Sequence, residues 1–256
     1  MKILGLAAPF SHDASAALVI DGKVVAAAEE ERFTRVKHEG RAPINAIDFC
    51  LKYANVKPSD IDLVAFPWSI EPLRQYRFEY LTRTLFTKPS KGFKKFFRNR
   101  WEFDHRKDFV YRTLHECGFD LDKIKVEWVE HQIAHAASAY YLSGMKEAAV
   151  LSIDAGGEIT STLMGYTENG QIKKIKEITS EDSLGNFYAT MTDYLGFDRG
   201  EGEYKVMGMA PYGDPSKINF DHIIWWDEKK KTFHCNDDYI WVIRTNRARM
   251  DKVYSK

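Results

Sequence analysis

The sequence predicts a duplicated α/β fold, in which one arrangement of strands and helices occurs twice along 256 residues. Near the amino terminus, residues 2–29 contain three β-rich runs, and Asp21-Gly22 joins the second run to the third. Residues 149–178 contain three more such runs, and Asn169-Gly170 joins the second of these to the third. Asp-Gly and Asn-Gly between β-rich runs are strong hairpin signals. Each copy is followed by helix, so we expect two α/β halves.

The spacing within the two copies supports the duplication. From Ile3 to the turn residue Asp21 is 18 positions, and from Val150 to Asn169 is 19. Halves of this kind face each other across a cleft, and ligands bind between them.

The first half is expected to span residues 1–145 and to alternate helix with strand after its hairpin. A helix at 43–54 has Pro43 near its first turn and apolar residues at helical spacing. The apolar run at 61–68 is typical of a buried strand. The remaining elements of this half are a helix at 108–118, a strand at 125–130 and a helix at 131–143.

An insertion at 69–107 interrupts this half with eleven Lys or Arg against four acids, and aromatic residues are interleaved among them. We interpret it as a solvated helical insertion, and a surface for an anionic ligand or a partner stays open.

Composition excludes several classes of function. Lys plus Arg equals Asp plus Glu at 37 each, so no global charge favours nucleic acid or a membrane as partner. No segment approaches the roughly 18 apolar residues of a membrane helix, and the apolar amino-terminal run is too short for a signal peptide. Cys50, Cys117 and Cys235 lie far apart, so free thiols and a cytoplasmic location are expected.

Each half is expected to contain three antiparallel strands followed by alternating helix and strand. This repeated order resembles the superfamily of actin, sugar kinases and heat-shock chaperone ATPases (ASKHA), which is built on RNase H-like halves. In that superfamily the first hairpin of each half holds nucleotide phosphates. The resemblance therefore implies cofactor binding by Gly156 and Gly157, whose amides can approach an anion closely. The second half, 146–256, is expected to be incomplete, since one β-rich stretch follows Gly213 before the basic end at 244–256.

His131 and His135 are the first candidate site. At positions i and i+4 of a helix they share one face, about 6 Å apart along the axis, which suits two imidazoles on one metal. Asp154 ends the strand VLSID and could complete a ligand set for iron or zinc. A structural role for the histidine pair stays open.

His12 and Asp13 stand in the loop between the first two strands. His12 is suited to remove a proton from a hydroxyl, because an imidazole titrates near the working pH. The alternative is a turn in which Asp13 only caps backbone amides.

Two further segments carry charge into loops. The first segment places several cations where the third strand is expected to end. These cations could bind a phosphate or a carboxylate group, or they could simply be solvated. A glycine-rich loop after a helix at 186–196 is expected to bring Lys205, with Glu201 and Glu203, close to a ligand or to the facing half. The cations at the strand end are Arg32, Arg35, Lys37 and His38.

Five motifs in order resemble those of the carbamoyltransferase family that includes nodulation-factor and antibiotic O-carbamoyltransferases. The motifs are HDASA, AAAEEERFTRVKH, EHQIAHAASAYYLSG, LSIDAGGE and GEGEYKVMGMAPYGD. The resemblance implies an actin-like amino-terminal domain that passes a carbamoyl group to a substrate hydroxyl. A carboxyl-terminal YrdC-like domain makes carbamoyl adenylate from carbamoyl phosphate and ATP in such proteins.

The resemblance also implies roles for residues. A metal, usually iron, would be bound by His131, His135 and Asp154, and His12 would act as base or orient the acceptor, with Asp13 beside it. From charge and position, Lys205 and the 35–38 cations could balance the leaving phosphate. The implied partners are a small hydroxyl acceptor, carbamoyl phosphate and ATP, while Mg²⁺ and a homodimer stay open.

The chain ends at Lys256 without a YrdC-like domain, so we expect a fragment that is inactive alone, with a short natural relative as the alternative. Two other functions stay open. A kinase of the same fold could use Asp154 but has no use for the histidine pair. A non-catalytic binding module would hold a partner through the basic insertion.

Overall fold

The computed structural model describes residues 1–7, 12–69, 71–86 and 89–236. The chain divides into two compact units, Met1–His131 and Gln132–Lys256, so the division falls earlier in the chain than residue 145. The basic stretch at 244–256 lies outside the described residues.

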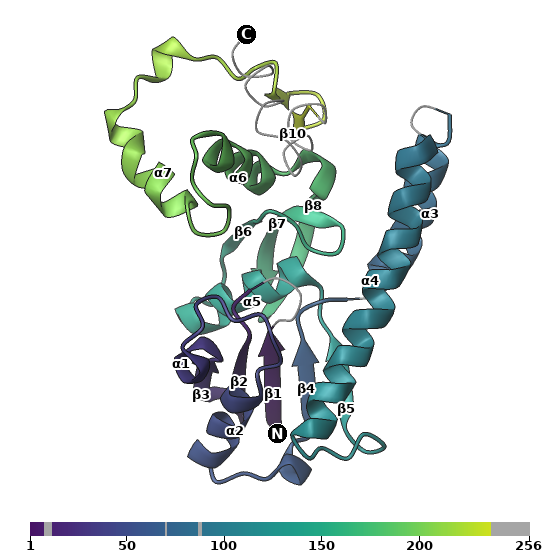
Figure 1. Ribbon diagram of the computed structural model, residues 1–256, viewed down its shortest axis with the longest axis vertical. Coiled ribbons are helices and arrows are strands. Elements are labelled where there is room, and N and C mark those ends of the chain that lie inside the picture. Colours follow the sequence, from purple (N-terminus) through teal and green to yellow (C-terminus); the bar gives the residue numbers. More distant parts are fainter. Residues whose placement is uncertain (8–11, 70, 87–88, 237–256) are drawn as a thin grey trace. The chain divides into compact units, whose positions relative to one another are not determined.

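The first unit is built on a five-stranded sheet with the order β3-β2-β1-β4-β5 (Figure 1). β1, β2 and β3 are antiparallel neighbours, and β4 and β5 join them as parallel strands. Asp21 and Gly22 have positive φ of 49° and 80°, as a tight two-residue hairpin turn requires. The predicted strand order of this half is confirmed. The strands are β1 (Lys2–Ala7), β2 (Ser15–Ile20), β3 (Lys23–Glu29), β4 (Leu63–Phe66) and β5 (Lys125–Trp128).

Helices α2 (Ile44–Tyr53) and α4 (Pro89–Glu116) complete the core of this unit. α2 buries one face against β2 and β3, as its apolar spacing predicts, although Ile44 at its first position stays exposed. The side chains that are wholly buried in this core include Leu4, Leu18, Ile47, Val64 and Leu114.

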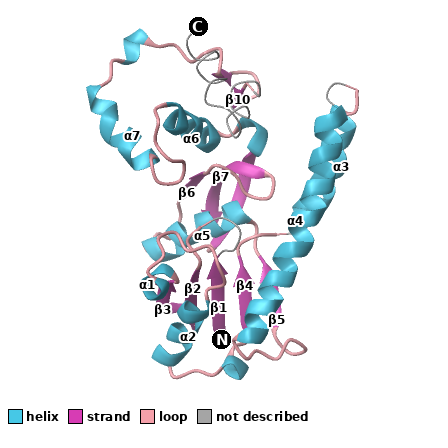
Figure 2. Ribbon diagram, viewed as in Figure 1, coloured by secondary structure: helices cyan, strands magenta, loops and turns pink. Residues whose placement is uncertain are grey.

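The insertion is a helical hairpin of α3 (Glu71–Thr84) and α4, as Figure 2 shows. The separate helix expected at 108–118 is wrong, because it is the carboxyl-terminal part of the 28-residue α4. The physical reason is that neither proline nor glycine interrupts the chain from 93 to 116. A Cβ added at Gly92 would lie 2.3 Å from Oγ1 of Thr84, so this glycine lets the two helices approach closely.

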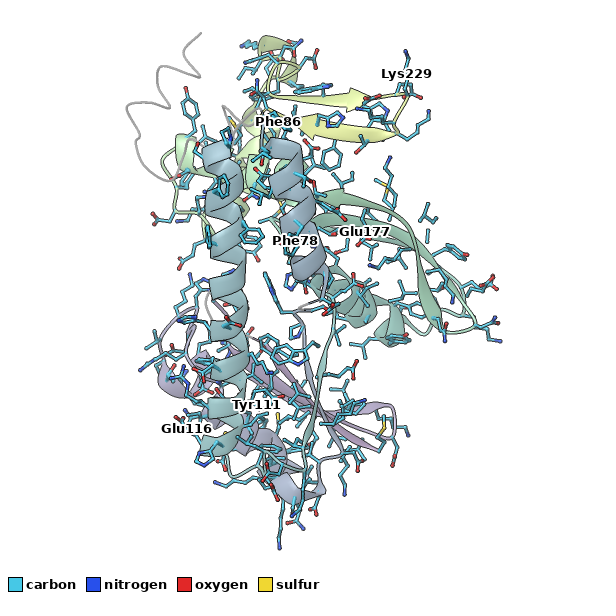
Figure 3. The ribbon with its side chains drawn as sticks, turned by 90° about the vertical axis from the view of Figure 1, so that its right-hand side faces the viewer. Phe78, Phe86, Tyr111, Glu116, Glu177 and Lys229 are labelled. Atoms are coloured by element: carbon cyan, nitrogen blue, oxygen red, sulfur yellow. The ribbon has the colours of Figure 1, made fainter. Side chains whose placement is uncertain are left out.

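Aromatic side chains lie exposed on the described part of this hairpin. Phe78 on α3 and Phe86 just after it are both exposed, and Figure 3 labels them with Tyr111 and Glu116, which mark the other end of α4. Among the described residues Phe86 is 92% exposed, so this side chain is not part of the core.

The second unit contains the antiparallel sheet β6-β7-β8, which repeats the arrangement of β1 to β3. Asn169 and Gly170 have positive φ of 51° and 73°, and so form the second copy of the hairpin turn. The predicted duplication is therefore confirmed at the level of strand order. The strands are β6 (Ala149–Ile153), β7 (Thr160–Glu168) and β8 (Gln171–Thr179), and the hairpin β9 (Ile224–Asp227) and β10 (Thr232–Cys235) follows.

The α-helices in the described part of the second half are α5 (His131–Ser143), α6 (Leu184–Tyr194) and α7 (Glu203–Met209). Lys205 was expected in a glycine-rich loop. This prediction is wrong, because the residue lies on α7. Glu203 stands in the first turn of that helix, where an acidic side chain favours helix formation.

The two halves differ in how their first strands are covered. Leu4 and Leu6 of β1 are 0% and 5% exposed, whereas the corresponding residues of β6, Leu151 and Ile153, are 63% and 50% exposed. In the described chain the second sheet has three strands where the first has five, and β6 stands at its edge. The incompleteness expected for residues 146–256 stays a prediction, because residues 237–256 lie outside the described part of the chain.

The three cysteines are thiols, and Cys50 and Cys235 are buried. Burial raises the pKa of the Cys117 thiol to about 11, which leaves it protonated and unreactive at neutral pH. Among the described helices, none has both the length and the apolar character that crossing a membrane requires.

Candidate functional site

α5 carries the two histidines on one face and begins shortly after β5. His135 Nε2 lies 3.6 Å from a carboxylate oxygen of Asp154, the residue that follows β6. One potential ligand atom from each of His131, His135 and Asp154 lies within 4.8 Å of the other two. The structure therefore brings together the three residues that the sequence singles out for a metal.

The His131 ring is oriented by the segment after β4. Its Nδ1 lies 3.1 Å from the carbonyl oxygen of Pro67, and its ring packs at a tilt on Trp68, with ring centroids 5.1 Å apart. A carbonyl oxygen only accepts hydrogen bonds, so Nδ1 carries the proton and Nε2 offers its lone pair to a ligand.

Gln132 fixes the start of α5 to the second sheet. This buried side chain donates from Nε2 to the carbonyl oxygen of Thr160 (3.2 Å), and its Oε1 accepts from Ser152 Oγ (2.5 Å). Both partners lie on the strands that lead to and from the Asp154 loop. Sequence reasoning missed this residue, and a glutamine at the mouth of an alanine-rich helix is a weak signal.

The Asp154 loop is held by the amino-terminal end of α6. Ser183 Oγ lies 3.1 Å and 2.8 Å from the carbonyl oxygens of Asp154 and Ala155, and Asn186 Nδ2 donates to the latter carbonyl (2.8 Å). Ser183 also caps α6 by accepting from the Asn186 amide (3.0 Å). The same hydroxyl therefore starts the helix and fixes the loop.

Gly185 allows α6 to approach this loop. A Cβ at this position would lie 2.4 Å from the Ala155 nitrogen and 2.5 Å from the Asp154 carbonyl carbon, both of which are backbone atoms. Real Cβ atoms do not approach backbone that closely, so only glycine fits here. The signal was present in the sequence as Ser-Leu-Gly-Asn at the expected start of a helix.

Gly156 and Gly157 lie in the loop between β6 and β7. The Gly157 amide already donates to the carbonyl of Thr160 (2.9 Å), and a Cβ at Gly156 would meet Ser180 Oγ at 3.1 Å. Phosphate binding by these glycines stays a prediction.

A cavity of about 470 Å³ adjoins this centre within the second unit. His135 and Asp154 both line it, and most of the remaining wall comes from α5 and β6. Its position beside two potential metal ligands gives a small molecule room to reach them. The apolar part of the lining includes Ala136, Ala139, Met145, Val150 and Leu151.

In the first unit, the loop before β2 brings His12, Asp13 and His38 together. Asp13 has a carboxylate oxygen 2.6 Å from His12 Nδ1, and its other oxygen lies 2.8 Å from His38 Nδ1. Partial burial acts to raise the pKa of Asp13, but the hydrogen bonds from His38 and His12 and their charges outweigh it and hold that pKa below its ordinary value. Asp13 is therefore an ionised acceptor shared by two imidazoles.

The cations of the 32–40 segment have different surroundings. The expected strand end is a short helix, α1 (Glu31–Thr34), and Arg35 ends it in the left-handed conformation with φ 61°. Arg35 and Lys37 are exposed, whereas His38 lies against Asp13. Lys205 is exposed on α7, with Nζ 5.7 Å from the centre of the Phe197 ring.

Glu39, the residue after His38, is paired with Arg41. The Glu39 carboxylate accepts from Arg41 through both oxygens (3.0 and 2.7 Å) and from its amide (3.0 Å). The Glu39 carbonyl accepts from the Ala14 amide (2.7 Å). The Glu39 backbone therefore links the segment after α1 to the residue before β2.

Replacing Glu39 with glutamine is expected to make the free energy of unfolding depend less steeply on pH below pH 5. The Arg41 hydrogen bonds lower the pKa of Glu39 from 4.5 to about 2, so its contribution is present above pH 4.5 and is lost as the pH falls toward 2. Urea midpoints at pH 5, 4 and 3 should therefore fall less steeply in E39Q than in the parent chain. Parallel declines would show that the pair does not contribute.

Comparison with known proteins assigns the family. The model of the family described as carbamoyltransferase N-terminus matches residues 2–254. The chain belongs to this family. It is 35% identical over 215 residues to the nodulation protein NolNO of Sinorhizobium fredii, covering 83% of this chain and 29% of that protein. It is 36% identical over 223 residues to the uncharacterized protein sll1178 of Synechocystis, covering 85% of this chain and 35% of that one.

The chain thus spans about a third of the length of the curated relatives it matches. Likeness to solved structures is weak. Component A of (R)-2-hydroxyglutaryl-CoA dehydratase from Acidaminococcus fermentans gives a TM-score of 0.42 at 13% identity, over 84% of this chain and 70% of that one. YeaZ from Pseudomonas aeruginosa gives 0.36 at 15% identity, over 70% and 66%.

Proposed function

We propose that this chain is the acceptor-side part of an ATP-dependent O-carbamoyltransferase, which transfers the carbamoyl group of carbamoyl adenylate to a hydroxyl of a sugar-like or secondary-metabolite acceptor. The observation that carries the proposal is the convergence of two imidazoles and one carboxylate within 4.8 Å, in a chain of the carbamoyltransferase family. A kinase would need no such ligand set.

His131, His135 and Asp154 would hold the metal, which we propose to be iron or zinc. The donor set fits, because imidazole nitrogen and carboxylate oxygen are usual ligands of both metals. The Pro67 carbonyl supports the fit, since it leaves Nε2 of His131 available. A bound metal would supply a Lewis acid that polarises the carbamoyl carbonyl.

His12 would accept the proton of the attacking hydroxyl. The acceptor oxygen forms a bond to the carbamoyl carbon, and the bond from that carbon to the phosphate oxygen breaks, so that AMP leaves. The proton passes from the hydroxyl to His12 and then to water. Arg35, Lys37 and Lys205 are exposed cations that could balance the charge on AMP.

A binding measurement tests this proposal on the chain itself. The probe is a stable analogue, 5′-O-(N-carbamoylsulfamoyl)adenosine, in which a sulfamate replaces the reactive mixed anhydride. Calorimetry on the zinc-loaded chain should show the analogue binding about tenfold more tightly than AMP, because only the analogue carries a carbamoyl group. The preference should disappear in H135A and persist in H115A, which replaces an exposed histidine on α4. Equal affinity for AMP and the analogue would contradict the proposal.

A further inference from the structure

The first unit contains a hydrogen-bonded chain of three side chains that family membership alone does not explain. His12 and His38 bind different oxygens of the Asp13 carboxylate, at 2.6 and 2.8 Å, and their rings stand edge to face with centroids 6.3 Å apart. The sequence separates the two histidines by a strand hairpin and α1. Their convergence on one carboxylate comes from the fold.

We propose that His38 is a positioning residue for His12: it anchors the Asp13 carboxylate, which in turn fixes the proton of His12 on Nδ1 and leaves Nε2 as the base. The catalytic meaning rests on the proposed function, since His12 is the base only if the carbamoyl transfer occurs. The positioning itself does not depend on that function.

The backbone is shaped to make this contact. Asp13 and His38 both have left-handed backbone, with φ of 61° and 54°. Such a conformation costs roughly 1 kcal/mol for a residue that is not glycine. Two short backbone hydrogen bonds hold the segments together, from the Ala14 amide to the Glu39 carbonyl and from the Glu30 amide to the Ala14 carbonyl, both 2.7 Å. Asp13 and His38 are both strained and are joined by a hydrogen bond. Strain at both partners favours a functional reason for their contact.

The protonation of each group follows from its partners. An ionised carboxylate only accepts hydrogen bonds, so both imidazoles must present Nδ1–H to Asp13. The hydrogen bonds from His38 and His12 keep Asp13 ionised, since they hold its pKa below the ordinary value. The neutral form of His12 is then the tautomer with an unprotonated Nε2, which is the form that can remove a proton.

His12 needs this support because it is exposed. Its side chain is 60% accessible and that of Asp13 is 43% accessible, so neither is held by packing. His38 is more enclosed, at 30%, and its amide donates to a carboxylate oxygen of Glu31 (2.9 Å). The more buried histidine is therefore the anchor, and the more exposed one is free to meet a substrate.

The charged groups around the chain of three are themselves paired. Arg32 lies 3.1 Å from Glu31 and 2.9 Å from Glu29, and Arg41 pairs with Glu39. The His38 amide is therefore held by Glu31, and its ring by Asp13. The sequence placed His38 in a group of cations suited to a phosphate or carboxylate, and that role would turn its ring to an outside anion instead.

Nitrogen NMR of the ¹⁵N-labelled chain tests the proposal without any substrate. At a pH where the imidazoles are neutral, both His12 and His38 in the parent chain should show a protonated Nδ1 and an unprotonated Nε2. In H38A the fraction of His12 with protonated Nδ1 should fall to about half, because an exposed ring without an anchored acceptor samples both tautomers. H38Q should restore the parent pattern, since the glutamine amide can donate to Asp13. H115A is the matched control and should leave His12 unchanged.

Two results from these spectra would overturn the inference. One is an unchanged His12 tautomer in a folded H38A. The other is an unprotonated Nδ1 on His38 in the parent chain, which decides the matter even if H38A does not fold. Titration with Zn²⁺ adds a check, because Asp13, Glu31 and His38 also lie within 4.8 Å of one another. Stoichiometric loss of the His38 Nδ1–H signal at low Zn²⁺ would identify a metal ligand rather than an anchor.

Discussion

Replacing His135 with alanine is expected to lower the affinity of the chain for zinc or iron by at least about 100-fold. The substitution removes one of three potential ligands, whereas loss of a residue that only supports a ligand already costs 10–100-fold. His135 is exposed and lies on α5, so alanine should not disturb the core. Metal content after dialysis and calorimetric titration measure the change.

H115A provides the matched control, because it also removes an exposed imidazole from a helix. H131A and D154N should each reproduce the loss seen in H135A, since all three residues belong to one group. If H135A and H115A bound the metal equally well, the group would be structural, and the alternative left open for the histidine pair would be correct.

Replacing Gly185 with alanine is expected to destabilise the chain by about 1–3 kcal/mol and to weaken metal binding as well. In an open helix, alanine would be favoured over glycine by up to about 1 kcal/mol. Here the new Cβ would lie 2.4 Å from the Ala155 nitrogen, and because backbone cannot yield as a flexible side chain can, the overpacking outweighs that gain. The Asp154 loop must move, and the metal ligand moves with it.

Gly208 offers a control with the opposite sign. It lies inside α7, and a Cβ there would have nothing within 4 Å, so G208A should stabilise the chain by about 0.5–1 kcal/mol and leave the metal affinity unchanged. Urea unfolding and metal titration of both variants measure the two effects. A G185A chain as stable as the parent would refute the role given to this close approach.

The pairing of β2 with β3 and of β7 with β8 followed from hairpin signals, because Asp21-Gly22 and Asn169-Gly170 favour a tight turn between β-rich runs. Helix bounds were harder to predict. Nothing in residues 93–116 marks a start within α4, and the helix at Glu203 was hidden by the glycines before it. Propensity sets where a helix can form, but packing sets where it begins and ends.

The sequence predicted those residues of the candidate site whose spacing lies within one helix or at the end of one strand. His131 and His135 share a helix face, and Asp154 directly follows a strand, so periodicity, topology and the resemblance to the carbamoyltransferase family together predicted this group. Gln132, Ser183 and Gly185 could not be found in this way, because their partners are backbone carbonyls and amides on other elements. The contact of His38 with Asp13 depends on two left-handed residues, which no periodicity reveals.

Anomalous diffraction from crystals of the zinc-loaded chain tests the central claim most directly. The metal should appear as a single peak about 2.0–2.2 Å from an imidazole nitrogen of His131, an imidazole nitrogen of His135 and a carboxylate oxygen of Asp154. A peak elsewhere, with these three side chains pointing away from any common centre, would contradict the claim that they form a metal centre.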